Sequence, residues 1–257
     1  MASHLSEAAA PPAGDVRRST RPDWSPNRSV RTGSVIAGAG ILLLAALAAV
    51  GQLVVIEGLV TDGDAAKTSR DILASEGLFR FGIASWYVVA ILDLVVSWAL
   101  LQVFSPVDRG IARLAAWTRL AYTAVLVVSV SQLAGVPSLL RSDDYSAAFG
   151  EEQLQAQAML KIDTFNDLWI AALVLFGVHL FLLGYLALRS GYVPKVIGVL
   201  LVVAGAGYLF DSFGTVLSQG SPIVVSTVTF VGEFVLACWL VIRGRRVSLT
   251  IPEAREA

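Results

Sequence analysis

The chain has 257 residues, of which 56% are hydrophobic and 15% are charged, and its net charge is −1. Its mean hydropathy is +0.70, whereas a typical soluble domain carries about 25% charged residues, so a soluble globular domain is excluded. The balance of charge also argues against a nucleic-acid partner, which requires a basic surface. We therefore expect an integral membrane protein whose main partner is the lipid bilayer.

Six apolar stretches are each long enough to cross a bilayer, which takes roughly 20 residues. They predict an all-α, polytopic membrane protein, a bundle of six transmembrane helices. The expected spans are 35–60, 82–104, 112–135, 167–188, 195–217 and 223–242. The transmembrane domain then covers residues 34–243, between a disordered N-terminal tail (1–33) and a C-terminal tail (244–257).

Two polar segments between the spans predict short cap helices outside the membrane. The segment Asp62–Arg80 has a helical pattern with Asp64 as N-cap. The segment Glu151–Trp169 is also helical and is continuous with the fourth span. The paired aspartates in these outer segments lack the ligand spacing of a known metal-binding loop, so no metal site is predicted.

The distribution of basic residues predicts the orientation of the bundle. Most of them precede the first span, lie in the second and fourth loops, or follow the last span. Because basic residues concentrate on the cytoplasmic side, we expect both termini in the cytoplasm. An even number of spans agrees with this expectation.

Four ionisable residues fall at a similar depth in four different spans. Counting 1.5 Å per helical residue, Asp93, His179 and Glu233 lie about 15–18 Å below the outer surface and Arg119 about 20 Å. A charge at a helix centre costs about 2.5–3.5 kcal/mol, so these side chains should face inward and satisfy one another. We predict an Asp93–Arg119 pair, and a His179 side chain that contacts a carboxylate or a water-filled pocket.

The candidate substrate or proton site therefore consists of Asp93, Arg119, His179, Asp211 and Glu233, with Tyr122 and Tyr208 as supporting residues. Asp211 lies nearer the outer surface, next to Tyr208 and Ser212. Two interpretations stay open for this group. It is either a polar site or proton relay inside the membrane, or a set of structural ion pairs that fixes helix packing.

The stretch FGVHLFLLGYLALRSGYVPKVIGVLLVVAGAGYLFDSF (Phe176–Phe213) resembles a bacterial six-span membrane protein family catalogued as domain of unknown function 4386. The segments Glu76–Leu101 and Trp117–Tyr122 resemble its second and third spans. The resemblance covers roughly residues 34–243 and implies six helices in a bacterial inner membrane. It implies that motif positions of the family are occupied by Arg80, Asp93, Arg119, His179, Tyr185, Pro194, Tyr208 and Asp211, which adds Arg80 and Tyr185 to the supporting residues.

The residues favour a small transporter or ligand-binding protein that uses the mid-depth polar group for a small solute or a proton. A non-catalytic regulatory or structural membrane protein is the alternative. An intramembrane lipid hydrolase ranks third, because His179 is the one histidine in a span and no GxSxG motif is present. No catalytic residue is assigned, and no cofactor is predicted, since no phosphate loop, haem motif or flavin motif occurs.

Overall fold

The computed structural model describes residues 26–217 and 231–247, and every regular element in those residues is a helix. Five helical stretches are apolar and long enough to cross a membrane. In chain order they are α1 (Pro26–Ala49) continued by a π-helix (Val50–Ile56) and α2 (Glu57–Leu59), then α4 (Glu76–Phe104), α5 (Arg109–Ala134), α8 (Glu151–Arg189) and α9 (Lys195–Leu217). The chain is a multi-pass membrane protein.

The sixth expected span is only partly described. The helix α11 (Val231–Ile242) is apolar and has 12 residues, and residues 223–230 of the expected span lie outside the described residues. The count of six spans is therefore not confirmed. A 3-10 turn (Gly244–Arg246) follows α11.

The ends of the chain fall largely outside the described residues, which exclude 1–25 and 248–257. The first helix begins at Pro26, so residues 26–33, expected as part of a disordered tail, are helical. A proline fits the first turn of a helix because its missing N–H has no partner there in any case.

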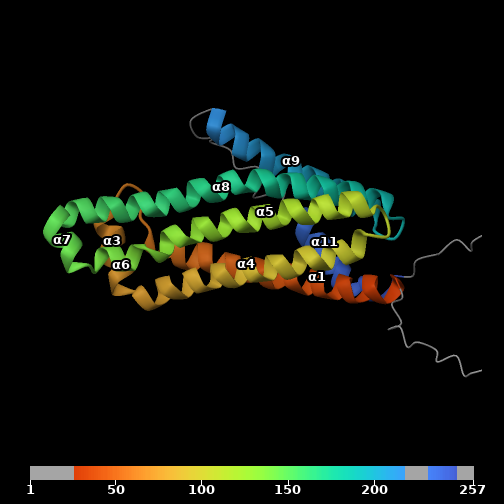
Figure 1. Cartoon of the computed structure of the whole chain (residues 1–257), viewed down its shortest axis with the longest axis horizontal. Coiled ribbons are helices and arrows are strands. Elements are labelled where there is room, and N and C mark those ends of the chain that lie inside the picture. Colours follow the sequence, from red (N-terminus) through yellow and green to blue (C-terminus); the bar gives the residue numbers. More distant parts are fainter. Residues whose placement is uncertain (1–25, 218–230, 248–257) are drawn as a thin grey trace, which may run out of the picture.

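The polar segments between the spans form the expected helices. The helix α3 (Ala65–Ala74) is capped by Asp64, whose carboxylate accepts a hydrogen bond from the Lys67 amide at 2.8 Å. The helix α8 runs unbroken from Glu151, as predicted. Two further short helices, α6 (Val136–Leu140) and α7 (Asp143–Phe149), gather with α3 at one end of the bundle (Figure 1).

The long helices pack as a closed ring that follows chain order. The helix α1 packs on α4, α4 on α5, α5 on α8 and α8 on α9, and α11 contacts both α9 and α1. Figure 1 shows α1, α4, α5 and α8 running nearly parallel to one axis, while the C-terminal end of α9 points away from the others. Side chains that face the centre of this ring come from helices far apart in the sequence.

Glycines bring three of these helices into backbone contact. A Cβ atom on Gly177 of α8 would lie 3.0 Å from the carbonyl oxygen of Gly205 on α9, and one on Gly205 would lie 2.7 Å from that of Gly177. A Cβ atom on Gly232 of α11 would lie 2.6 Å from the Leu200 carbonyl oxygen. Small residues allow this close approach in membrane bundles. The contact of Gly232 with α9 fixes the position of the next residue, Glu233.

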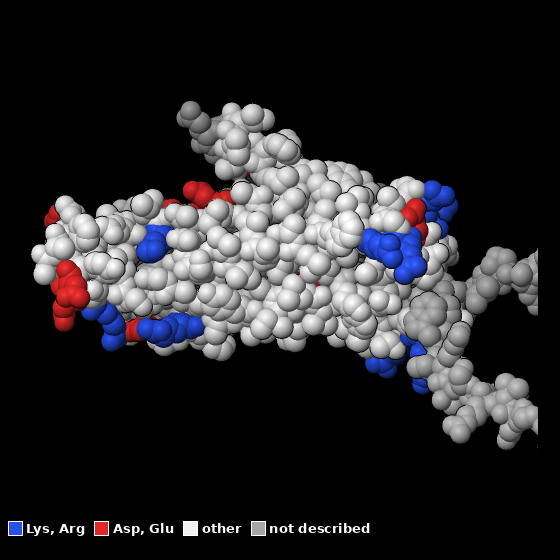
Figure 2. All heavy atoms as spheres, viewed as in Figure 1, with Lys and Arg blue, Asp and Glu red and all other residues white. Residues whose placement is uncertain are grey.

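Charged side chains are confined to the two ends of the face shown in Figure 2, with a broad band free of exposed charge between them. Large apolar side chains are exposed along the bundle, among them Ile91, Trp117 and Phe210, at 59%, 65% and 60% of their area. An exposed apolar band between charged ends is the surface expected of a protein that lies in lipid.

The two described ends of the chain lie together. The Arg31 Nε–H near the start of α1 donates a hydrogen bond to the carbonyl oxygen of Val247, 2.9 Å away. We therefore predict that both termini are on one side of the membrane, and that this side is the cytoplasm because basic residues flank it. Fusions of green fluorescent protein at Ala2 and at Ala257 should fluoresce, and fusions of alkaline phosphatase at the same positions should be inactive.

An insertion of alkaline phosphatase after Gly150, between α7 and α8, serves as the control and should be active. Phosphatase activity at either terminus would contradict the predicted orientation.

Candidate functional site

Four helices of the ring each contribute one ionisable side chain to a single group at its centre. These are Asp93 from α4, Arg119 from α5, His179 from α8 and Glu233 from α11, hereafter the Arg119 cluster. Arg119 is fully buried, and Asp93 and His179 are each 1% exposed. The sequence placed these four residues at a similar depth, and the structure brings them into direct contact.

Arg119 forms its closest ion pair with Asp93. The Arg119 Nε–H donates to Asp93 Oδ1 at 2.8 Å, and Nη2 lies 2.5 Å from the same oxygen. The Nη2 contact is close enough for charge pairing but does not have hydrogen-bond geometry, and Nη2 has no hydrogen-bond partner among the described residues. Asp93 thus neutralises Arg119 through both Nε and Nη2.

Glu233 holds Arg119 by a single contact. The Arg119 Nη1–H donates to Glu233 Oε1 at 3.0 Å. The Glu233 side chain is 14% exposed, compared with 2% for the Asp93 side chain. The two carboxylates around Arg119 are therefore unequal, because Asp93 faces two guanidinium nitrogens and is sealed, whereas Glu233 faces one and is partly accessible.

His179 is held as a neutral ring by its two neighbours. Its Nδ1 lies 2.7 Å from the Ala115 carbonyl oxygen, which can only accept, so Nδ1 carries the hydrogen. Its Nε2 then accepts from Arg119 Nη1 at 3.3 Å. The prediction that His179 contacts a carboxylate or a water-filled pocket stays a prediction, and its hydrogen bonds reach Asp93 and Glu233 through Arg119. Ala115 and Arg119 are one turn apart on α5, and together they occupy both ring nitrogens.

Aromatic rings cover one side of the Arg119 cluster. The Phe176 ring centre lies 5.3 Å from Arg119 Cζ, within the range of a cation–π contact. The same ring lies 4.9 Å from the Tyr122 ring and 5.4 Å from the Tyr208 ring, between ring centres. The two tyrosines were predicted as supporting residues. Phe176 was not singled out from the sequence, although its spacing of three residues from His179 places both on one face of α8.

The remaining predicted site residues lie elsewhere. Asp211 is half-buried on α9, one turn from Tyr208 towards the helix end, and its carbonyl oxygen accepts from the Thr215 hydroxyl at 2.9 Å. Arg80 is exposed at the first turns of α4 and pairs with Glu76 at 2.6 Å. Glu76 also pairs with Arg141, after α6.

Tyr185 is two turns beyond His179 on α8, at the opposite end, where its hydroxyl accepts from Arg189 Nη1 at 2.6 Å. The structure therefore places Arg80 and Tyr185 at the two ends of the bundle, away from the Arg119 cluster.

A second aromatic group lies on the side of the cluster nearer the outer end. Trp86, seven residues before Asp93 on α4, packs edge-on against Trp169, with 5.1 Å between ring centres, and against Phe165. The Trp86 indole nitrogen is buried, and no described residue accepts a hydrogen bond from it, whereas the buried Trp169 indole N–H is a hydrogen-bond partner of the Tyr122 hydroxyl. A buried donor without a partner costs about 1–3 kcal/mol, and water or a ligand is the usual partner at such a position.

The Arg119 cluster has an excess of negative charge. It contains two carboxylates and one guanidinium, and the neutral His179 adds no charge, so the cluster carries one net negative charge when both carboxylates are ionised. One bound proton would balance it. Within the described ranges, no group of three or more His, Cys, Asp or Glu side chains is arranged to hold a metal ion.

Comparisons with known proteins give one relative and one family for this chain. An "Uncharacterized protein" of Archaeoglobus fulgidus is 30% identical over 168 residues, which cover 65% of this chain and 86% of that protein. No solved structure matches the chain. Residues 36–244 match the family described as "Domain of unknown function (DUF4386)", and they include α4, α5, α8, α9, α11 and all four members of the Arg119 cluster. The chain belongs to this family.

Proposed function

We propose that this protein binds a small solute and moves it across the membrane together with a proton, and that the Arg119 cluster is the coupling site. The observation that carries the proposal is the pairing of one buried guanidinium with two unequal carboxylates, Asp93 and Glu233. Ionisable residues buried in a membrane bundle commonly mark proton relays and substrate sites.

The charge balance supports a proton at this site. A net charge at the centre of a membrane bundle is costly, because no water is there to solvate it. With both carboxylates ionised, the cluster has a net negative charge and this free-energy cost applies. Binding of one proton removes the net charge. The cluster therefore has a physical reason to bind one proton and to hold it.

The contacts indicate which carboxylate takes the proton. Asp93 is sealed and faces two nitrogens of Arg119, so protonating it would break the closest ion pair. Glu233 has one contact and a side chain that is 14% exposed. Glu233 is therefore the carboxylate that exchanges a proton in the proposed cycle.

The same proton would open a place for a solute. When Glu233 is neutral, its pull on Arg119 Nη1 weakens, so that Nη1 can donate to another oxygen acceptor. A guanidinium with free N–H groups binds oxygen acceptors, most strongly a carboxylate or phosphate. The proposed solute is a small molecule with such a group, and the unpartnered indole N–H group of Trp86 offers a further donor.

Replacing Glu233 with glutamine should abolish proton movement while leaving the fold intact. Purified protein is reconstituted in liposomes that carry a pH-sensitive dye, and an imposed pH gradient is followed over time in the presence of small carboxylate or phosphate compounds, because a coupled carrier moves protons only together with its solute. The wild type should dissipate the gradient faster than empty liposomes, and Glu233→Gln should match the empty liposomes, because glutamine keeps the shape but cannot release a proton.

Glu57→Gln is the matched control, since Glu57 is an exposed carboxylate near the outer end of the first helical stretch. It should retain the wild-type rate. A Glu233→Gln variant that dissipates the pH gradient as fast as the wild type would contradict the proposal that Glu233 is the proton site.

The alternative function, a structural or regulatory membrane protein, rests on a different observation. Arg119 joins α5 to α4, α8 and α11 through its contacts with Asp93, His179 and Glu233. A charge network of this kind can fix helix positions without any turnover. In that case the cluster is important for stability and Glu233 has no separate role.

The pairing of Asp93 with Arg119 predicts coupled effects on stability. Asp93→Asn and Arg119→Gln should each lower the melting temperature in detergent, since removing one partner of a buried ion pair costs about 3–5 kcal/mol. The double variant should recover part of the loss, because neither charge is then left alone.

The coupling is obtained from a thermodynamic cycle over the four proteins. Close partners differ from additivity by about 0.5–3 kcal/mol, and strictly additive losses would show that the pair is not coupled. Glu233→Gln belongs in the same series: a stability loss as large as that of Asp93→Asn would favour the structural function.

A further inference from the structure

Two cavities lie end to end along the seam between α4 and α5. The first, of about 420 Å³, is at the end of the bundle where both described chain ends lie, and it is lined by Ser29, Leu101, Gln102, Ser105, Pro106, Arg109 and Arg113. The second, of about 270 Å³, lies further along the same two helices and is lined by Tyr87, Ala90, Ile91, Leu94, Leu120, Thr123, Ala124 and Val127. We propose that the two together bind one anionic phospholipid, with its phosphate in the first cavity and an acyl chain in the second.

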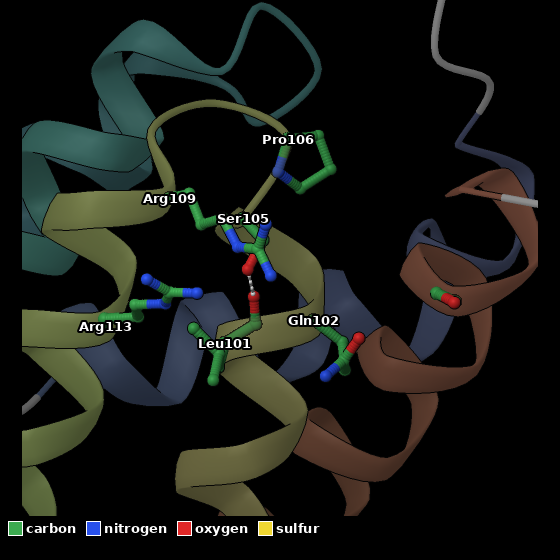
Figure 3. Close-up of a pocket in the computed structure, with 7 residues that line it drawn as sticks. Leu101, Gln102, Ser105, Pro106, Arg109 and Arg113 are labelled. Carbon is green, nitrogen blue, oxygen red and sulfur yellow. Dashed lines mark hydrogen bonds between the residues drawn. The ribbon is translucent and has the colours of Figure 1, made fainter.

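The first cavity has the chemistry of a phosphate site. Arg109 and Arg113 are one turn apart on α5, and neither forms an ion pair with any carboxylate in the described part of the chain. Figure 3 shows the Arg109 guanidinium beside Ser105 and Arg113 on the side of Leu101, while Gln102 extends from α4 in the opposite direction. Two guanidinium groups on one helix face match the oxygens of a phosphate, to which each can donate two N–H bonds.

The other polar groups of the first cavity determine which hydrogen-bond donors it offers. The Ser105 hydroxyl donates to the Leu101 carbonyl oxygen at 2.6 Å, so its own hydrogen is already used. The Ser29 hydroxyl, the Gln102 amide and the two arginines are the other polar groups that line the cavity. No carboxylate lines the cavity, so charge complementarity favours an anion.

The second cavity has the chemistry of an acyl-chain site. Its lining is almost entirely apolar, and Ile91 and Leu94 on α4 are exposed over 59% and 49% of their area. Leu120 and Val127 on α5 are exposed over 39% and 41%. From Trp117 to Val127, α5 rises about 15 Å, which is about half of the 30 Å hydrocarbon thickness of a bilayer, and therefore about one leaflet.

Two tryptophans lie between the two sets of lining residues along α4 and α5. Trp98 on α4 and Trp117 on α5 are exposed over 51% and 65% of their area. Trp117 is one turn from Arg113 and Trp98 is one turn from Gln102, so both lie between the polar cavity and the apolar one. Tryptophan is enriched where headgroups meet hydrocarbon, as expected for a lipid with its phosphate on one side of this level and its chains on the other.

The apolar cavity also borders the Arg119 cluster. Thr123 lines the cavity, and its hydroxyl donates to the carbonyl oxygen of Arg119 at 2.8 Å. Ala90 lines it as well and is one turn from Asp93. An acyl chain in this seam packs against the helix faces that hold the closest ion pair of the cluster.

The test measures retention of phosphatidylglycerol by the full chain. Native mass spectrometry of protein in detergent, titrated with phosphatidylglycerol or phosphatidylcholine, should show one tightly held phosphatidylglycerol and weaker binding of phosphatidylcholine. Each charge at a membrane surface is worth about fivefold in binding, so the double variant Arg109→Gln, Arg113→Gln should bind phosphatidylglycerol about 25-fold more weakly.

Two further variants separate the parts of the site. Arg245→Gln removes an exposed arginine that lies outside the first cavity, after α11, and should leave binding unchanged. Ala124→Trp fills the second cavity from an exposed position and should weaken binding without affecting the arginines.

Three binding results would overturn the proposal. The first is equal affinity for phosphatidylglycerol and phosphatidylcholine. The second is that Arg109→Gln, Arg113→Gln weakens phosphatidylglycerol binding no more than Arg245→Gln does. The third is that glycerol 1-phosphate displaces the lipid fully and binds with the same affinity. The last would identify a soluble phosphate compound as the ligand. A dimer that excludes lipid from the seam would equally contradict it. None of these outcomes depends on the proposed proton site, because the measurement follows lipid and not protons.

Discussion

The burial of one guanidinium is the constraint on which the rest of the arrangement depends. Arg119 is fully buried in a membrane bundle, and an unpaired charge there would cost several kcal/mol. The groups that reduce this cost come from three other helices: Asp93 from α4, Glu233 from α11, and the His179 and Phe176 side chains from α8. The helices must therefore keep their relative positions at the depth of Arg119.

Close helix contact makes that register possible. The backbones of α8 and α9 touch through Gly177 and Gly205, and α11 touches α9 through Gly232. Gly232 is next to Glu233, so the same contact that packs α11 also positions the second carboxylate. The packing of α11 and the position of the Glu233 carboxylate therefore depend on two adjacent residues. A change in the position of α11 would change the contact between Glu233 and Arg119, which is the contact that we propose to be proton-dependent.

The sequence predicted the helices and the depth of the buried charges, because apolar length and helical rise are both local properties. It therefore placed Asp93, Arg119, His179 and Glu233 in one layer, and Asp64 as the cap of α3. It could not predict the partner of His179, because that depends on how α5 and α8 cross and on a backbone carbonyl, that of Ala115.

Residues whose position depends on tertiary packing could likewise not be placed from the sequence pattern. Arg80 and Tyr185 were predicted as supporting residues from a resemblance alone, and they lie at the two ends of the bundle. Phe176 reads as an ordinary apolar residue in the sequence, and its contact with Arg119 depends on tertiary packing. The apolar pattern also predicted six spans, of which five are described as long helices.

The central claim is that the Arg119 cluster is balanced by one proton, held on Glu233. Infrared spectroscopy of the purified protein in lipid at neutral pH tests this most directly, because a protonated carboxylic acid absorbs apart from a carboxylate. The account predicts a protonated carboxyl band in the wild type that is lost in Glu233→Gln and retained in Glu57→Gln. A spectrum without such a band, or one in which the band survives Glu233→Gln, would contradict it.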